Sequence, residues 1–131
     1  MLPILPPPRL LPLLQKMKET YILWYSYLLT LPKTHRYSLG QRIDTFCIET
    51  IEAIAIASFL SPAEKQPYVR LAIRKVDTVK ILLMILWETK SLDNKKYLAL
   101  SVKIDEVGRM LGGWKKGLET KLSPHNGREK Q

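Results

Sequence analysis

The sequence predicts an all-α protein, an up-down-up-down four-helix bundle, from three observations. Prolines and helix-capping residues divide the chain into four long segments. Apolar residues in these segments recur at steps of three and four, and none alternates as a strand does. The segments are about 20 to 30 residues long and are joined by short connections. We assign residues 1–8 to a proline-rich arm, 9–122 to the bundle and 123–131 to a disordered polar tail.

The first helix is expected to follow an arm whose prolines, at positions 3, 6, 7 and 8, favour an extended polyproline conformation. It begins between Arg9 and Pro12, since proline is tolerated in a first helical turn. Pro32 ends it. Its predicted core stripe is Leu14, Met17, Tyr21, Trp24, Tyr25, Leu28 and Leu31.

The second helix has more apolar surface than one bundle face requires. It opens at Ser38, where Ser38 and Gln41 have the spacing of a capping box, and it runs to about Leu60. From Phe46 to Leu60, 11 of 15 residues are apolar. Such a helix either lies deep within a compact bundle or buries a second face against another subunit. We favour the subunit interface, with these candidate residues: Ile48, Ile51, Ala55, Ile56 and Phe59.

The third helix has the clearest start, with Ser61 at the N-cap, Pro62 at the first helical position and Glu64 two residues later. Pro67 is expected to distort its second turn. The predicted core stripe is Val69, Ile73, Val76, Val79, Leu83, Leu86 and Trp87. The fourth helix is capped by Ser91 or Asp93 and has a coiled-coil-like stripe. That stripe is Tyr97, Leu100, Ile104, Val107, Leu111, Trp114 and Leu118.

Several classes of function are disfavoured by composition. One cysteine, Cys47, allows no intrachain disulfide and no thiolate cluster, and His35 and His125 lie far apart. Phosphate-binding glycine loops and nucleophile elbows are absent from the sequence. The acids of the second helix have no histidine nearby, so we expect no catalytic residue, metal, cofactor or small-molecule substrate. The sequence shows neither a signal peptide nor a membrane span, which predicts a cytoplasmic protein.

Charge is strong and unevenly distributed. The chain has 21 Lys plus Arg against 12 Asp plus Glu, a formal net charge of +9. Residues 37–61 hold one base and three acids, whereas residues 62–90 hold six bases against three acids and residues 91–122 seven against four. An excess of this size indicates a polyanionic partner, either nucleic acid or an acidic protein face.

Nucleic-acid contacts are therefore expected from the third and fourth helices, to phosphates and without strong sequence preference for RNA or DNA. The candidates are Arg70, Arg74, Lys75, Lys95, Lys96, Lys103, Arg109, Lys115 and Lys116. The alternative is a solvated face with weak helical ion pairs, Arg74 with Asp77 and Arg109 with Asp105. Among the aromatic residues of the first helix, only Tyr27 is expected to be exposed enough to stack on a base.

Two stretches are more specific than the helical pattern. One, residues 31–44, supplies Pro32, Arg36, Leu39, Gly40 and Arg42; the other, residues 106–116, supplies Gly108, Arg109, Gly112, Gly113 and Trp114. Together they resemble the accessory variability determinant (Avd) proteins of diversity-generating retroelements. The wider group includes the intervening-sequence proteins of bacterial 23S ribosomal RNA genes. Residues 49–57 depart from the Asn-Ile-Ala-Glu-Gly-like stretch usual in those proteins, which favours the Avd branch.

The resemblance implies a non-enzymatic protein that forms a barrel-like homopentamer with a basic surface. Avd-like proteins bind the reverse transcriptase of the element and its template-repeat RNA, and they support error-prone cDNA synthesis and mutagenic retrohoming. Five chains of charge +9 would carry about +45, a field that attracts nucleic acid. Two alternatives are a protein of the 23S intervening-sequence type and a basic structural oligomer that binds an acidic protein.

Gly112 and Gly113 interrupt a good helix, at about 1 kcal/mol each relative to Ala. They either end the helix or allow the close approach of another backbone, within the bundle or at a partner. We favour close approach, because Trp114 and Leu118 continue the apolar stripe beyond them.

Overall fold

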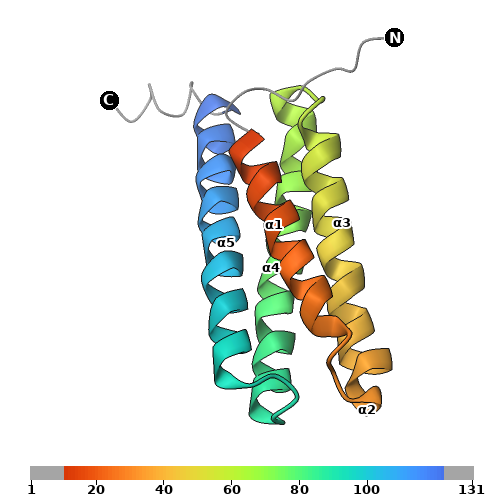
Figure 1. Cartoon of the computed structure of the whole chain (residues 1–131). Coiled ribbons are helices and arrows are strands. Elements are labelled where there is room, and N and C mark those ends of the chain that lie inside the picture. Colours follow the sequence, from red (N-terminus) through yellow and green to blue (C-terminus); the bar gives the residue numbers. More distant parts are fainter. Residues whose placement is uncertain (1–10, 123–131) are drawn as a thin grey trace.

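The computed structural model describes residues 11–122, and this part of the chain is a bundle of four long helices without strands (Figure 1). The long helices are α1 (Leu11–Leu28), α3 (Gln41–Ala57), α4 (Pro62–Glu88) and α5 (Asn94–Leu122). A short helix, α2 (Lys33–His35), and a π-helical turn, η2 (Arg36–Gly40), lead into α3. The expectations for the arm, 1–8, and the tail, 123–131, lie outside the described residues.

The helices alternate in direction, and each packs along its two neighbours, so the predicted bundle is confirmed (Figure 1). The predicted stripes of α4 and α5 supply half of the buried hydrophobic residues that form the core of the bundle. Buried core residues from these helices are Val69, Val76, Val79, Leu83, Leu86, Leu100, Ile104, Val107, Leu111, Trp114 and Leu118. Burial of such side chains contributes about 1.5–3 kcal/mol each relative to exposure and holds the four helices together.

The core stripe predicted for the first helix is partly wrong. Leu13 is buried while Leu14 is only half-buried, and Tyr25 is 51% exposed. The buried face follows Leu13, Met17 and Trp24, with Thr20 between them, at steps of four, three and four. The buried hydroxyl of Thr20 has a hydrogen-bond partner within the helix, since it donates to the carbonyl of Lys16 at 2.7 Å.

At the end of α4, Trp87 was predicted in the core but is 39% exposed. Its ring stacks on Tyr97 with centroids 5.0 Å apart, and its indole Nε1 donates to Asn94 Oδ1 at 2.6 Å. Trp87 therefore covers the end of the bundle, while Leu92 in the following turn is buried in its place.

The predicted start of the second helix is wrong. Ser38 does not cap a helix: its hydroxyl donates to the carbonyl of Thr34 at 2.8 Å, inside a helical segment that already began at Lys33. Pro32 is the N-cap, and its carbonyl accepts the amides of His35 and Arg36 at 2.9 and 2.8 Å. Proline is disfavoured in a helix interior but is suited to a helix boundary. The turn after α1 therefore leads directly into a new helix at Pro32.

Arg36 and Gly40 fix this turn against α1. The guanidinium of Arg36 donates to the carbonyls of Leu31, at 3.0 Å, and Leu29, at 3.2 Å, which terminates the first helix. A Cβ at Gly40 would lie 3.0 Å from Leu28 Cδ1, Leu31 Cδ1 and the carbonyl oxygen of His35. A side chain at this position would force these neighbours to shift, so glycine suits the close packing of η2 on the end of α1.

The start of α4 confirms the prediction. The amide of Ser61 donates to Glu64 Oε1 at 3.2 Å and its hydroxyl at 2.8 Å, and these hydrogen bonds lower the pKa of Glu64. Pro67 lies inside α4, which continues through it as one helix to Glu88, although proline lacks the amide that would donate to the carbonyl four residues earlier. Sequence reasoning missed Lys65, whose buried Nζ donates to the carbonyl of Ala57 at 2.7 Å and caps the end of α3.

The turn between α4 and α5 shows which of the two candidates, Ser91 or Asp93, caps α5. Asp93 Oδ1 accepts the amide of Lys96 at 2.8 Å, so Asp93 is the N-cap of α5. Ser91 instead hydrogen-bonds His35 Nδ1, which ties this turn to α2. At the end of α4, Lys90 adopts the left-handed conformation, with φ of 67°.

Candidate nucleic-acid interface

A basic groove lies between α4 and α5. It has a volume of about 250 Å³ and is lined by Arg70, Ile73 and Arg74 from α4 and Lys115 from α5. Arg70 and Arg74 are one helical turn apart and exposed, and within residues 11–122 neither guanidinium forms an ion pair. Two unneutralised guanidinium groups on one turn present forked donors suited to neighbouring phosphates.

Two more candidates lie on the exposed face of α5, outside the lining of this groove. Arg109 and Lys116 are seven residues apart, with Gly112 between them on the same face. Both side chains are exposed and, within the described part of the chain, without an acidic partner. Of the predicted residues, the structure therefore brings three together in the groove, Arg70, Arg74 and Lys115.

Lys95 and Lys96 are not part of this surface. Lys95 is fourteen residues before Arg109, about 21 Å along the helix axis. Lys96 faces α1, where its Nζ lies 5.5 Å from the centre of the Tyr27 ring and 3.2 Å from Thr30 Oγ1. The expectation for Tyr27 is wrong: it is half-buried beneath Lys96, and Tyr25 is the exposed aromatic residue of α1.

Three of the predicted contact residues form ion pairs, Lys75, Lys103 and Lys115. Lys75 Nζ lies 2.8 Å from Glu49 Oε1 and 5.0 Å from the centre of the Phe46 ring, so it joins α4 to α3. Lys115 forms a longer pair with Glu119, at 3.9 Å. Lys75 in particular is held by its acid and ring, and we assign it to packing between helices.

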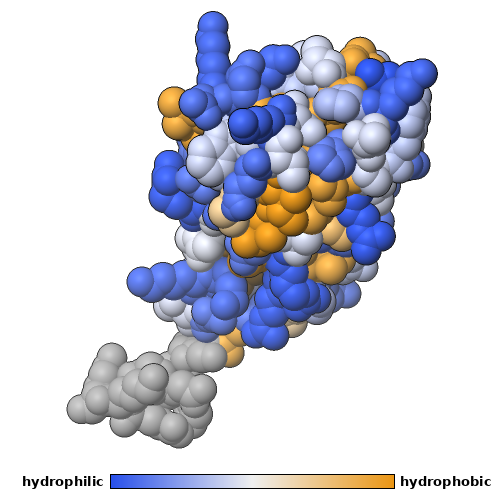
Figure 2. Space-filling model, turned by 90° about the horizontal axis from the view of Figure 1, so that it is seen from below, coloured by the Kyte–Doolittle hydropathy of each residue, from blue (hydrophilic) through white to orange (hydrophobic). Residues whose placement is uncertain are grey.

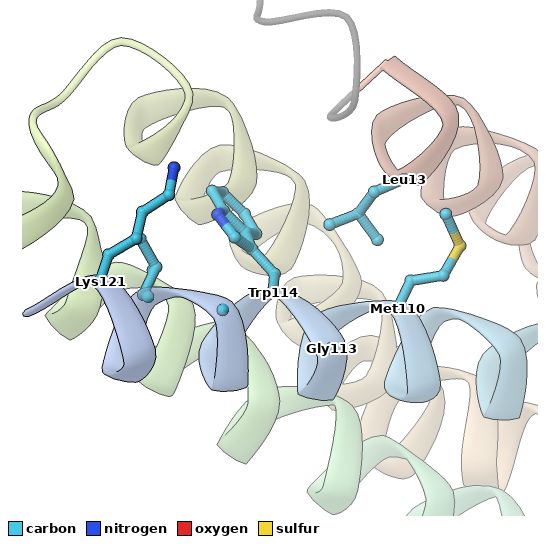
Figure 3. Close-up of a pocket in the computed structure, with 7 residues that line it drawn as sticks. Leu13, Met110, Gly113, Trp114 and Lys121 are labelled. Atoms are coloured by element: carbon cyan, nitrogen blue, oxygen red, sulfur yellow. The ribbon is translucent and has the colours of Figure 1, made fainter. Parts of the chain in front are cut away.

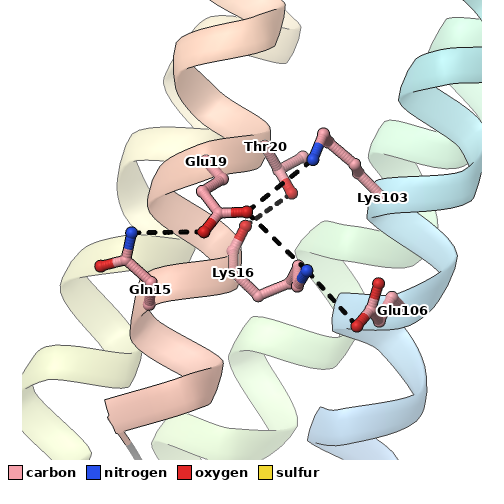
Figure 4. A network of polar contacts seen from close by, with 6 residues as sticks. All are labelled: Gln15, Lys16, Glu19, Thr20, Lys103 and Glu106. Atoms are coloured by element: carbon pink, nitrogen blue, oxygen red, sulfur yellow. Dashed lines mark hydrogen bonds and ion pairs between the residues drawn. The ribbon is translucent and has the colours of Figure 1, made fainter.

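Lys103 belongs to a network between α1 and α5 (Figure 4). Its Nζ is 3.8 Å from Glu19 Oε1, and Lys16 bridges Glu19, at 3.7 Å, and Glu106, at 3.5 Å. Gln15 donates to the other oxygen of Glu19 at 3.3 Å. The charged groups are partly exposed to solvent, so each pair contributes only about 0.2–1 kcal/mol, but the network neutralises Lys103.

The helical ion pairs proposed as the alternative for the arginines do not form. Asp77 and Asp105 both form ion pairs with Lys80, whose Nζ lies 4.0 and 3.5 Å from their carboxylates. This cluster leaves Arg74 and Arg109 without the acids that their spacing suggested. It also separates the basic groove from the basic residues at the start of α5.

The groups that could carry chemistry are instead structural. Asp44 accepts the indole proton of Trp24 at 3.2 Å. Burial, reinforced by a hydrogen bond to Asp44, raises the pKa of Tyr21 to about 12. Among the described residues there is no group of three potential metal ligands.

Cys47 is expected to be unreactive in the folded protein. Burial raises the pKa of its thiol to about 12, so the nucleophilic thiolate is scarce at neutral pH. A thiol-modifying reagent at pH 8 should label the native chain at least tenfold more slowly than the chain unfolded in urea. Equal rates in the two states would contradict the buried position.

The apolar residues of α3 and of the turn after it, which holds Phe59, divide into a buried and an exposed set. Ile48, Ile56 and Phe59 are 40%, 45% and 53% exposed, and Ala55 is half-exposed between them. Ile51 lies at the edge and is half-buried against the core. The alternative of a helix buried all round is therefore wrong for this chain. A second apolar patch, ringed by hydrophilic residues, is visible at the end of the bundle where α2 and the α4–α5 turn lie (Figure 2).

The second motif has two structural roles and two unexplained glycines. A Cβ at Gly108 would lie 3.0 Å from Lys80 Nζ, the flexible end of a side chain, and 3.8 Å from Val76 Cγ1, so this glycine leaves space for the Lys80 ammonium group. Trp114 is nine-tenths buried. Gly112 and Gly113 neither end α5, which runs to Leu122, nor meet another part of the bundle, since a Cβ on either would have no neighbour within 4 Å. Close approach within the bundle, one of the two forms expected, is therefore wrong.

Comparisons with known proteins address the family directly. Within residues 11–122, no helix is both long and apolar enough to cross a membrane. No match was found among curated proteins or among solved structures. The family model described as bAvd-like matches residues 11–118, which include α1, α3 and α4, α5 as far as Leu118, and both motifs. The chain therefore belongs to the bAvd-like family, as the two motifs suggested.

Proposed function

We propose that this protein is a non-enzymatic, nucleic-acid-binding accessory of a diversity-generating retroelement. In this proposal it associates with the reverse transcriptase and the template RNA, and it supports error-prone cDNA synthesis and mutagenic retrohoming. The observation that carries the nucleic-acid step is the groove of Arg70, Arg74 and Lys115, where two exposed guanidinium groups have no acidic partner among the described residues. Membership of the bAvd-like family supports the retroelement context.

The proposal includes a ring of subunits, a homopentamer, as the form that binds. A closed ring needs a heterologous interface, in which one face of each subunit meets a different face of the next. The exposed apolar face of α3 supplies one candidate face: Ile48, Ala55, Ile56 and Phe59. Glu52 lies within it and has no ion pair in the described part of the chain, which suits a basic residue on the neighbour.

A double substitution tests the nucleic-acid step. Arg70→Ala with Arg74→Ala should weaken binding of both single-stranded RNA and DNA. It should lower the magnitude of the log-affinity against log-salt slope by about 0.7 for each lost phosphate contact. Filter binding at several salt concentrations measures both quantities. The variant should still fold, because both side chains are exposed.

The matched control is Lys18→Ala with Lys33→Ala, which removes two exposed charges outside the groove. If binding depends only on net charge, the two double variants will weaken it equally, and the groove is not the site. An unchanged affinity in the arginine variant, or binding that is independent of salt, would support the alternative of an acidic protein partner.

A further inference from the structure

An apolar groove lies at the end of the bundle where α1 begins and α5 ends (Figure 3). Its volume is about 320 Å³. It is lined by Leu13 from α1 and by these residues of α5: Met110, Gly113, Trp114, Gly117, Leu118 and Lys121. None of these residues belongs to the basic groove between α4 and α5, so the two sites are separate.

Two observations indicate that this groove lacks an occupant within residues 11–122. A Cβ at Gly113 or Gly117 would meet no atom within 4 Å, so space lies open above both. The Nε1 of Trp114 is buried, yet it donates no hydrogen bond to any described residue. A buried donor without an acceptor is unfavourable, and a segment that supplies a carbonyl would satisfy it. In Figure 3 this nitrogen lies on the edge of the ring nearer Lys121.

We propose that the occupant is this chain's own proline-rich segment, residues 1–8. Its sequence, MLPILPPP, offers apolar side chains and four prolines, which carry carbonyl acceptors but no amide donors. That chemistry matches a groove with apolar walls and one unpaired donor. Aromatic-lined grooves commonly bind proline-rich segments in this way, and Gly113 and Gly117 allow the backbone to come close.

Chain length and position favour the segment over another molecule. Residue 8 is only three positions before Leu11, where α1 starts, and Leu13 is itself part of the groove. From Gly113 to Lys121 the axis of α5 rises about 12 Å. Four residues in polyproline conformation cover that length at about 3.1 Å each. A segment tethered this closely has an effective concentration in the millimolar range, above that of a separate partner.

The three tryptophans allow a direct test by NMR of their indole N–H groups. Deletion of residues 2–8 should shift the Trp114 signal and speed its exchange with solvent at least tenfold. The signals of Trp24, bonded to Asp44, and Trp87, bonded to Asn94, should not change. A synthetic peptide of residues 1–10, added to the shortened chain, should restore the Trp114 signal. No change at Trp114 on deletion would overturn the proposal.

A pair of glycine variants tests the groove in the full chain. Gly113→Leu places a side chain in the groove, whereas Gly112→Leu, on the same helix, places one in open space outside its lining. Both changes raise helix propensity equally. The heteronuclear NOE of residues 2–8 should drop to values of a flexible chain in the Gly113 variant only. Equal values in the two variants would overturn the proposal.

A mixing experiment separates the chain's own segment from that of a second copy. Isotope-labelled chain without residues 2–8 is co-refolded with unlabelled full chain, so that mixed assemblies form. If each segment fills its own groove, Trp114 of the labelled chain stays at its unfilled position. If it moves to the filled position, the segment comes from another subunit, and the assignment within one chain is wrong.

Discussion

Replacement of Ile56 by Asp is expected to turn the assembly into a monomer of about 15 kDa, the mass of one chain being 15.2 kDa. In the separate subunit, this side chain is already 45% exposed, so the aspartate stays hydrated and the helices remain. In an interface the same carboxylate loses its water without a partner, which costs several kcal/mol at each contact. Light scattering measures the mass, and far-UV circular dichroism measures the helix content.

The control for this prediction is Ile81→Asp on α4, which makes the same change at an isoleucine that is slightly more exposed, at 53%. It should leave the mass unchanged. If Ile81→Asp dissociates the assembly and Ile56→Asp does not, the interface lies on α4 and not on α3. A wild-type chain that already has the mass of a monomer would contradict the ring altogether.

Replacement of Trp24 by alanine is expected to lower the free energy of unfolding by about 3–5 kcal/mol, because it leaves a large cavity in the core. Trp24 is 1% exposed, and its loss also removes the donor to Asp44. The same change at Trp87, which is 39% exposed, removes a ring stack and one hydrogen bond and should cost about 1–2 kcal/mol.

This pair is informative because the sequence pattern placed both tryptophans in the core. Urea denaturation should be compared at one protomer concentration, since subunit association adds to apparent stability. Equal losses in the two variants would mean that Trp87 is as well packed as Trp24, against the structure. The Ile56→Asp background offers a second comparison, in which assembly no longer contributes.

Most of the fold could be predicted because a helix that packs in a bundle must repeat its apolar residues at steps of three and four. The pattern was strongest in α5, where every predicted core residue except the half-buried Tyr97 is buried. It was weakest at helix ends. Trp87 and Tyr25 fit the spacing, but whether a residue faces the core there depends on where the neighbouring helix stops.

The misplaced start of the second helix has a similar cause. Ser38 and Gln41 have the spacing of a capping box, but the helix was already started by Pro32. The π-helical turn that follows depends on the close packing of Gly40 on Leu28 and Leu31, a contact between helices that local sequence does not show. Gly40 belongs to the first sequence motif, but only the structure shows why a glycine is suited to this position.

The sequence predicts the candidate site only as a set of basic residues. The structure shows which of these residues have an acidic partner on a neighbouring helix and which do not. Lys75 meets Glu49 and Lys103 meets Glu19, partners 26 and 84 residues away in the chain. Pairings between helices of this kind are invisible to a search for acids three or four residues away. The same search offers Asp77 as a partner for Arg74 and Asp105 as a partner for Arg109. In the structure both acids bind Lys80 instead.

The π-helical turn also determines how this chain tolerates changes of length. Such a turn holds one residue more than an α-helical turn. Deletion of a residue between Arg36 and Gly40 would rotate the preceding segment by about 100° relative to α3. Arg36 would then leave the carbonyls of Leu29 and Leu31, and the end of α1 would lose its cap. At exposed positions such as Ser38 the turn should accept many substitutions, yet reject single-residue insertions and deletions.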